Sequence, residues 1–170
     1  MKHFISVLSA SMLLWVTTSQ SAEAQRPLRS LRLSGLTVSC QTARGQQVPI
    51  YLDDSQYQNI GRAGFYNNNP RQPFIAISPT WLNQVPYQAA VFWFYHECAH
   101  VNLPMGVGTY SQAAEINADC WALNRMAAHG LVRSGYDVNA IAATILPQRG
   151  SPMGHLPGPA RMNAMLRCLR

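Results

Sequence analysis

The sequence predicts an α+β fold in which a small, mainly antiparallel sheet comes first and is packed on a helical part that follows. Short β-prone runs separated by Gly, Asn and Pro clusters occupy the chain up to residue 78. Beyond residue 86 the pattern changes to longer apolar stretches bounded by helix-capping residues. The chain has no internal repeat and no low-complexity linker, so residues 25–170 are expected to form one domain.

The strand prediction depends on β-branched and aromatic residues, which favour extended backbone. The predicted strands are residues 36–40, 48–52 and 73–77. Between the second and third lies the Gly- and Asn-rich run 64–70, which indicates a mobile loop without ligand chemistry. The sheet is therefore predicted to be small.

Proline, serine and glycine mark the ends of the predicted helices. The apolar run 87–95 begins a buried helix that Pro104 stops. Ser111 is an N-cap candidate for the second helix, which is expected to run to His129 and to be closed by Gly130. Two further helices are predicted, one capped by Asp137 and ending before Pro147, the other over residues 159–169.

The first of these helices carries the run His96-Glu97-Cys98-Ala99-His100. Histidines four residues apart lie on one face of a helix, so both imidazoles can reach a single ion. Glu97, beside the first histidine, is placed to take a proton from a water molecule held there. Cys98 points about 200° around the helix from His96 and is therefore an unfavourable ligand.

A second pair of polar residues follows on the next predicted helix. Glu115 comes fifteen residues after His100, and Asp119 lies four residues further, again on one helical face. Because the chain has only seven acidic residues, two stacked on one face are informative. The two helices together therefore predict a metal site.

These residues resemble the signature of the gluzincin metallopeptidases, a His-Glu-x-x-His helix followed by a separate helix with Glu-x-x-x-Asp. The run 114–122 is similar in particular to that second helix in small bacterial gluzincins. The resemblance implies that His96, His100 and Glu115 bind one Zn²⁺ ion per chain. It also implies that Glu97 is the general base and that Asp119 orients a ligand imidazole without touching the ion.

The same resemblance implies a cleft lined by the sheet. In gluzincin-like proteins an edge strand lies along the cleft, and residues 74–78 are the candidate for a strand that pairs with an extended peptide. A plain core strand is an equal alternative. His155, in a loop resembling the His-Pro…Arg segment of small gluzincins, is the first candidate donor to the oxyanion, with Tyr110 second. A structural or merely exposed histidine is the alternative at that position.

Residues 1–24 predict a secretory signal, with a positive start, a short apolar core and a small-x-small cleavage site. A retained membrane anchor is the alternative. Removal of the signal would leave a chain without stable membrane insertion, exported to the periplasm or the extracellular medium. These two destinations are not distinguished by the sequence.

Four cysteines follow the predicted signal, which favours two disulfides in an oxidising compartment. Sequence alone allows three pairings. We expect Cys98 to pair with Cys120, because a shared zinc ion would draw their helices together, and Cys40 to pair with Cys168. A cysteine zinc ligand is the competing interpretation.

The chain carries a net charge of +6, and all cationic side chains beyond residue 2 are arginines. A basic surface can favour anionic polymers or membrane faces. These arginines are scattered, however, and the group Arg26, Arg29 and Arg32 is interpreted as a poorly ordered tail rather than a nucleic-acid arm. The expected partner is a peptide or protein substrate, with no nucleic acid.

The predicted function is therefore that of an exported zinc-dependent metallopeptidase, in which a metal-activated water attacks a peptide bond with a glutamate as base. Two alternatives remain open. One is a zinc-binding, peptidase-like protein without turnover, acting as a binding or structural module. The other is a disulfide-stapled helical scaffold in which the histidines are core residues.

Overall fold

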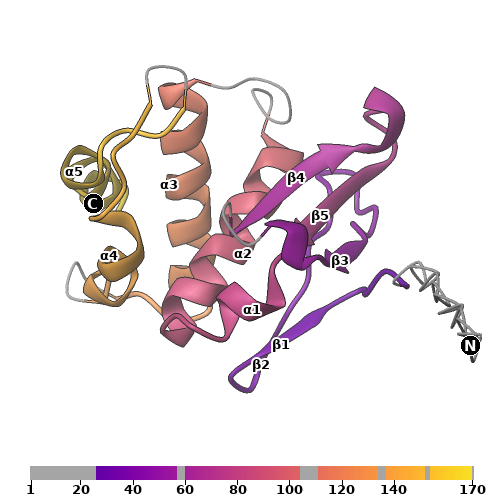
Figure 1. Ribbon diagram of the computed structural model, residues 1–170, viewed down its shortest axis with the longest axis horizontal. Helices are drawn as coiled ribbons and strands as arrows, with labels where there is room; N and C mark the ends of the chain where they lie inside the picture. The colour runs from indigo at the N-terminus through magenta and orange to yellow at the C-terminus, as the bar shows by residue number, and fades with distance from the viewer. Residues whose placement is uncertain (1–25, 57–59, 104–110, 134–136, 152–153, 170) are drawn as a thin grey trace, which may run out of the picture.

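The computed structural model describes residues 26–56, 60–103, 111–133, 137–151 and 154–169. The predicted signal at 1–24 and the candidate donor Tyr110 lie outside these ranges. The fold is α+β, as predicted. Two long helices run through the centre, with a sheet on one side and two shorter helices on the other (Figure 1).

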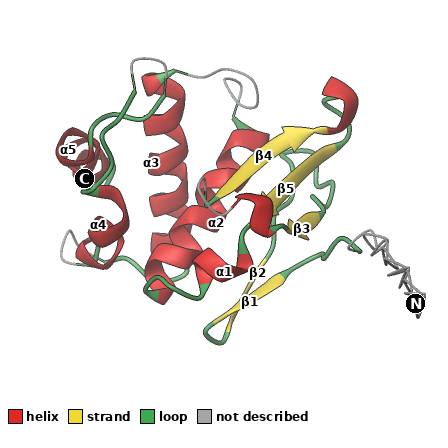
Figure 2. Ribbon diagram, in the orientation of Figure 1, coloured by secondary structure: helices red, strands yellow, loops and turns green. Residues whose placement is uncertain are grey.

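The main sheet has three strands in the order β3 (Ile50–Leu52), β5 (Pro73–Ile77) and β4 (Gly61–Phe65). β4 pairs antiparallel with β5, whereas β3 pairs parallel with it. A separate antiparallel hairpin is formed by β1 (Leu31–Leu33) and β2 (Leu36–Val38) (Figure 2). Short 3-10 turns, η1 (Asp54–Gln56) and η2 (Tyr66–Asn68), flank β4 in the sequence.

The position of β5 corrects two predictions. β5 is the central strand, so the expectation that residues 74–78 form an edge is wrong. The two edges of this described sheet are β3 and β4, and part of β4 was predicted as a mobile loop over 64–70. β4 contains no β-branched residue, and its pairing with β5 overrides weak local propensity. A Cβ at Gly64 would lie 2.5 Å from Cζ of Phe74, so glycine lets the opposing ring lie against the backbone.

The helices agree closely with prediction, except that the short α1 was not foreseen. They are α1 (Pro79–Leu82), α2 (Tyr87–Asn102), α3 (Gln112–Ala128), α4 (Asn139–Ile145) and α5 (Gly158–Arg167). Ser111 caps α3 by accepting a hydrogen bond from the Ala114 N–H. The N-cap of α4 is Val138 and not Asp137, whose carboxylate accepts a hydrogen bond from the backbone N–H of Arg133. Gly130 follows α3 with φ +69°, the left-handed conformation that ends a helix.

The core is built around α2, in which every residue from Ala89 to Ala99 is buried. Ile75 and Ile77 of β5 belong to the apolar cluster on the sheet side of this helix. Leu123 and Met126 of α3 belong to the same cluster. Polar side chains on α2 are therefore held in an environment that excludes water, so they need partners.

The N-terminal arginines are not in a disordered tail. Leu28 exchanges backbone hydrogen bonds with Ile50, and Arg32 lies within β1. Arg26, Arg29 and Arg32 remain exposed. The tail prediction was wrong because the apolar residues between these arginines, Leu28 and Leu31, attach the backbone to the sheet region.

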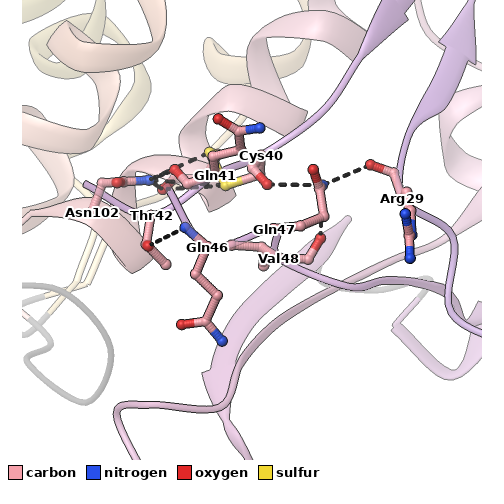
Figure 3. Close-up of a disulfide and its surroundings, with 9 residues drawn as sticks. Arg29, Cys40, Gln41, Thr42, Gln46, Gln47, Val48 and Asn102 are labelled. Atoms are coloured by element: carbon pink, nitrogen blue, oxygen red, sulfur yellow. Dashed lines mark hydrogen bonds between the residues drawn. A yellow bond between two sulfur atoms is a disulfide. The ribbon is translucent and has the colours of Figure 1, made fainter. Parts of the chain in front are cut away.

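The disulfides join Cys40 to Cys98 and Cys120 to Cys168, so both predicted pairings are wrong. Cys98 faces away from His96 and meets the segment that follows β2, whereas Cys120 meets the end of α5. The side chain of Asn102 lies beside the first disulfide and donates to the carbonyls of Cys98 and Gln41 (Figure 3). Each of the two central helices is thus tied to a different peripheral segment.

Replacing Cys40 and Cys98 together with alanine is expected to lower the free energy of unfolding by about 2–5 kcal/mol. The reason is that this bridge closes a loop of 58 residues and restricts the unfolded chain. Denaturant titration would measure the change, and the Cys120→Ala/Cys168→Ala protein, with a separation of 48 residues, should lose a similar amount. A change below about 0.5 kcal/mol in both variants would show that the bridges do not stabilise the fold.

Two disulfides fit a protein of an oxidising compartment such as the periplasm or the extracellular medium. Within the ranges described above, no helix combines the length and the apolar character needed to cross a membrane.

Candidate metal centre

The candidate site lies where α2 and α3 pack against each other in the middle of the molecule (Figure 1). α2 contributes His96 and His100, one helical turn apart, and α3 contributes Glu115 from its first turn. All three face the interface between the two helices, because the opposite sides of α2 pack against the sheet and the first disulfide. The structure thus brings together the three residues predicted to bind the metal.

The donor atoms of this group converge on one point. Nε2 of His96 lies 3.2 Å from Oε2 of Glu115, and Nε2 of His100 lies 3.6 Å from the same oxygen. The two Nε2 atoms are 3.1 Å apart. With all three donors within 4.8 Å of one another, the group could hold a metal ion.

The burial and charge of the Glu115 carboxylate test whether a cation fits between the three donors. Its Oε2 is buried and has no hydrogen-bond partner among the residues that the structure describes. Burial alone would raise the pKa of Glu115, but the imidazoles of His100, His155 and His96 hold that pKa well below its usual range. A charged, buried oxygen without a hydrogen bond, facing two imidazole nitrogens, fits a divalent cation better than it fits an empty space.

The predicted orienting residue, Asp119, lies behind His96. Its Oδ1 is 2.9 Å from Nδ1 of His96, on the side of the ring opposite to the converging Nε2 atoms. Burial would lower the pKa of His96, but its close contacts with the carboxylates of Asp119 and Glu115 outweigh it and raise that pKa to about 9. An imidazole held by a carboxylate through Nδ1 presents Nε2 to an ion in a fixed orientation.

Glu97 lies beside the three donors but is not one of them. Its side chain is only 7% exposed, and burial raises the pKa of its carboxyl group. β4 passes close over it, since a Cβ at Gly61 would lie 3.4 Å from Cγ of Glu97. The Glu97 side chain therefore lies against the start of β4, and its carboxyl group is within electrostatic range of the three candidate ligands.

His155, which precedes α5, also reaches the site. Its Nδ1 lies 2.8 Å from Oε2 of Glu115 but outside hydrogen-bond geometry, and its side chain is 36% exposed. The ring also lies 5.7 Å from that of His96 and 6.4 Å from that of Trp93, centroid to centroid. The structure thus places His155 at the solvent-facing rim of the group, and its part in oxyanion binding stays a prediction.

Two residues near the site were not predicted. Trp93 is buried with its ring 5.3 Å from that of His96, and its place three residues earlier on α2 is the signal that could have indicated this contact. Gln148 accepts a hydrogen bond from the buried Arg161 and has no such signal, because it lies on a distant segment between α4 and α5.

No family model, curated protein or solved structure matches this chain. The similarity to gluzincins therefore depends on the motif residues alone and stays a prediction. The geometry of the three donors, by contrast, is independent of any relative.

Metal binding near pH 7.5 is expected to release about one proton, because His96 must lose its proton to bind an ion. In the metal-free protein the raised pKa of His96, about 9, keeps the ring protonated at that pH. Its contribution to folding stability is complete below the unfolded value of 6.5 and is lost as pH rises through 9. Metal affinity should accordingly increase over this range. Calorimetry in buffers of different ionisation enthalpy would measure the proton release, and a heat independent of buffer would contradict the prediction.

Proposed function

We propose that this chain is an exported zinc-dependent peptidase. One observation carries the proposal. Two imidazoles from α2 and a carboxylate from α3 converge on one point, and a further buried carboxylate, Glu97, lies beside them without joining the group. Three nitrogen and oxygen donors leave a fourth position open, which is typical of catalytic rather than structural zinc sites.

A bound zinc ion would supply Lewis acidity, polarising the peptide carbonyl and lowering the pKa of a water molecule toward neutrality. Glu97 would accept the proton of the attacking water and then deliver it to the leaving amine. Burial raises the pKa of Glu97, which strengthens it as a base. His155, at the rim, would donate a hydrogen bond to the oxyanion.

The edge strand β4 is the proposed platform for the substrate, in place of residues 74–78. Among the strands that the structure describes, β4 is paired with β5 alone, and Gly61 brings its backbone close to Glu97. An extended peptide added to this edge would lie beside the proposed base, with main-chain hydrogen bonds supplying affinity independent of sequence. The substrate is therefore proposed to be an unstructured segment of a peptide or protein.

Metal analysis of the purified protein together with digestion of a mixed peptide library tests the proposal. One zinc ion per chain and cleavage that disappears with a chelator and returns with zinc are the expected results. Bound zinc without cleavage of any peptide would instead support a metal-holding module. Absence of zinc from protein refolded with excess metal would leave only the scaffold alternative.

A further inference from the structure

We propose that Arg161 of α5 is a positioning residue of the metal centre, acting on His96 through Asp119. The proposal rests on the metal site of the proposed function but not on hydrolysis. Arg161 is 1% exposed, so it is sealed from solvent and from any substrate that approaches from solvent. It is therefore not an oxyanion donor, and its burial needs another explanation.

The guanidinium of Arg161 forms a bidentate pair with the Asp119 carboxylate. Nε donates to Oδ2 over 2.7 Å, and Nη2 donates to Oδ1 over 2.6 Å. Such a two-pronged pair fixes the plane of the carboxylate, because rotation about its Cβ–Cγ bond would break both bonds. Oδ1 is also the atom that contacts Nδ1 of His96. By fixing the Asp119 carboxylate, Arg161 therefore also fixes the orientation of the His96 imidazole.

The Arg161 guanidinium has two further contacts, with Gln148 and Trp93. Nη1 donates to Oε1 of Gln148 over 2.8 Å, and the guanidinium lies 4.9 Å from the ring centroid of Trp93. The indole N–H of Trp93 in turn donates to Oγ1 of Thr144 on α4. The disulfide between Cys120, next to Asp119, and Cys168 keeps α5 against α3. α4 and α5 therefore form a rigid support for one ligand of the metal.

Metal affinity is the property that this support should change. Partners behind a ligand imidazole typically alter metal affinity by about 10- to 100-fold when removed. Replacing Arg161 with methionine leaves the Asp119 carboxylate without its orienting fork. We expect zinc affinity to fall within that range, as measured by competition with a chromogenic chelator.

A double-mutant cycle separates action through Asp119 from a general effect on folding. Asp119→Asn should weaken zinc binding by a similar factor, and Arg161→Met added to Asp119→Asn should change it by less than about threefold. Equal and additive losses, or zinc affinity of Arg161→Met within about twofold of wild type, would overturn the proposal. If Arg161→Met alone does not fold, Arg161→Lys takes its place in the cycle with Asp119→Asn, and the same outcomes apply.

Two further variants sharpen the result. Arg161→Lys keeps the charge but lacks the fork, so it should restore affinity only in part, and full restoration would mean that charge alone matters. Arg167→Met removes an exposed arginine from the same helix and should leave zinc affinity unchanged. A wild-type protein that binds zinc without cleaving peptides would refute the proposed peptidase while leaving this inference testable.

Discussion

The Glu97→Gln protein is expected to bind one zinc ion with nearly wild-type affinity. Its rate of peptide hydrolysis is expected to fall by about 10²- to 10⁴-fold. Glutamine has the shape of glutamate but cannot accept a proton from water. Glu97 is not one of the three converging donors, so its replacement leaves the metal ligands in place. Zinc content and peptide cleavage, measured on the same sample, check both parts of the prediction.

Asp54→Asn is the matched control, since it makes the same chemical change at an exposed carboxylate of η1, one that accepts the backbone N–H of Thr80 at the start of α1. It should retain both zinc and cleavage. Wild-type cleavage by Glu97→Gln would show that another group is the base. Loss of zinc from that variant would instead place Glu97 among the ligands.

The His96→Ala protein is expected to lose zinc binding and, with it, stabilisation by the metal. A ligand present at about a thousand times its dissociation constant adds about 4 kcal/mol to the stability of the wild type. Thermal denaturation with and without zinc should therefore show a large shift for the wild type and none for the variant. The metal-free variant should also lose about 1–3 kcal/mol, because Asp119 and Glu115 lose a buried partner.

His129→Ala provides the comparison. This histidine follows α3 and stacks on Tyr95, with ring centroids 5.9 Å apart, away from the converging donors. Its removal should leave the zinc-induced shift intact. A zinc-induced shift that persists in His96→Ala would mean that the remaining donors suffice or that the ion binds elsewhere.

The site helices were predictable because helical patterns are local. Two histidines four residues apart, and two acids four residues apart, necessarily share a face once the helices form. Burial of α2 followed from its apolar run, and Ser111 was recognisable as a cap. That these two faces meet each other was implied by the family signature alone.

Features that depend on tertiary pairing were not predictable in the same way. β4 contains two glycines and no β-branched residue, and it is held by β5, so its sequence favoured a loop. Cys98 of α2 and Cys120 of α3 point away from the interface between these helices, so each pairs with a peripheral cysteine. The prediction assumed instead that two helices sharing a metal ion would also share a disulfide. Arg161 and Gln148 reach the site from distant segments that no local period connects.

Because the two disulfides hold the helices that carry the candidate ligands, the metal centre should depend on the redox state of the compartment in which the chain folds. One bridge secures α2 to the segment that follows β2, and the other secures α3 to the end of α5. In a reducing environment the chain would lack both disulfides, so we expect its zinc affinity to be lower. The peptidase activity proposed above would then depend on formation of both disulfides.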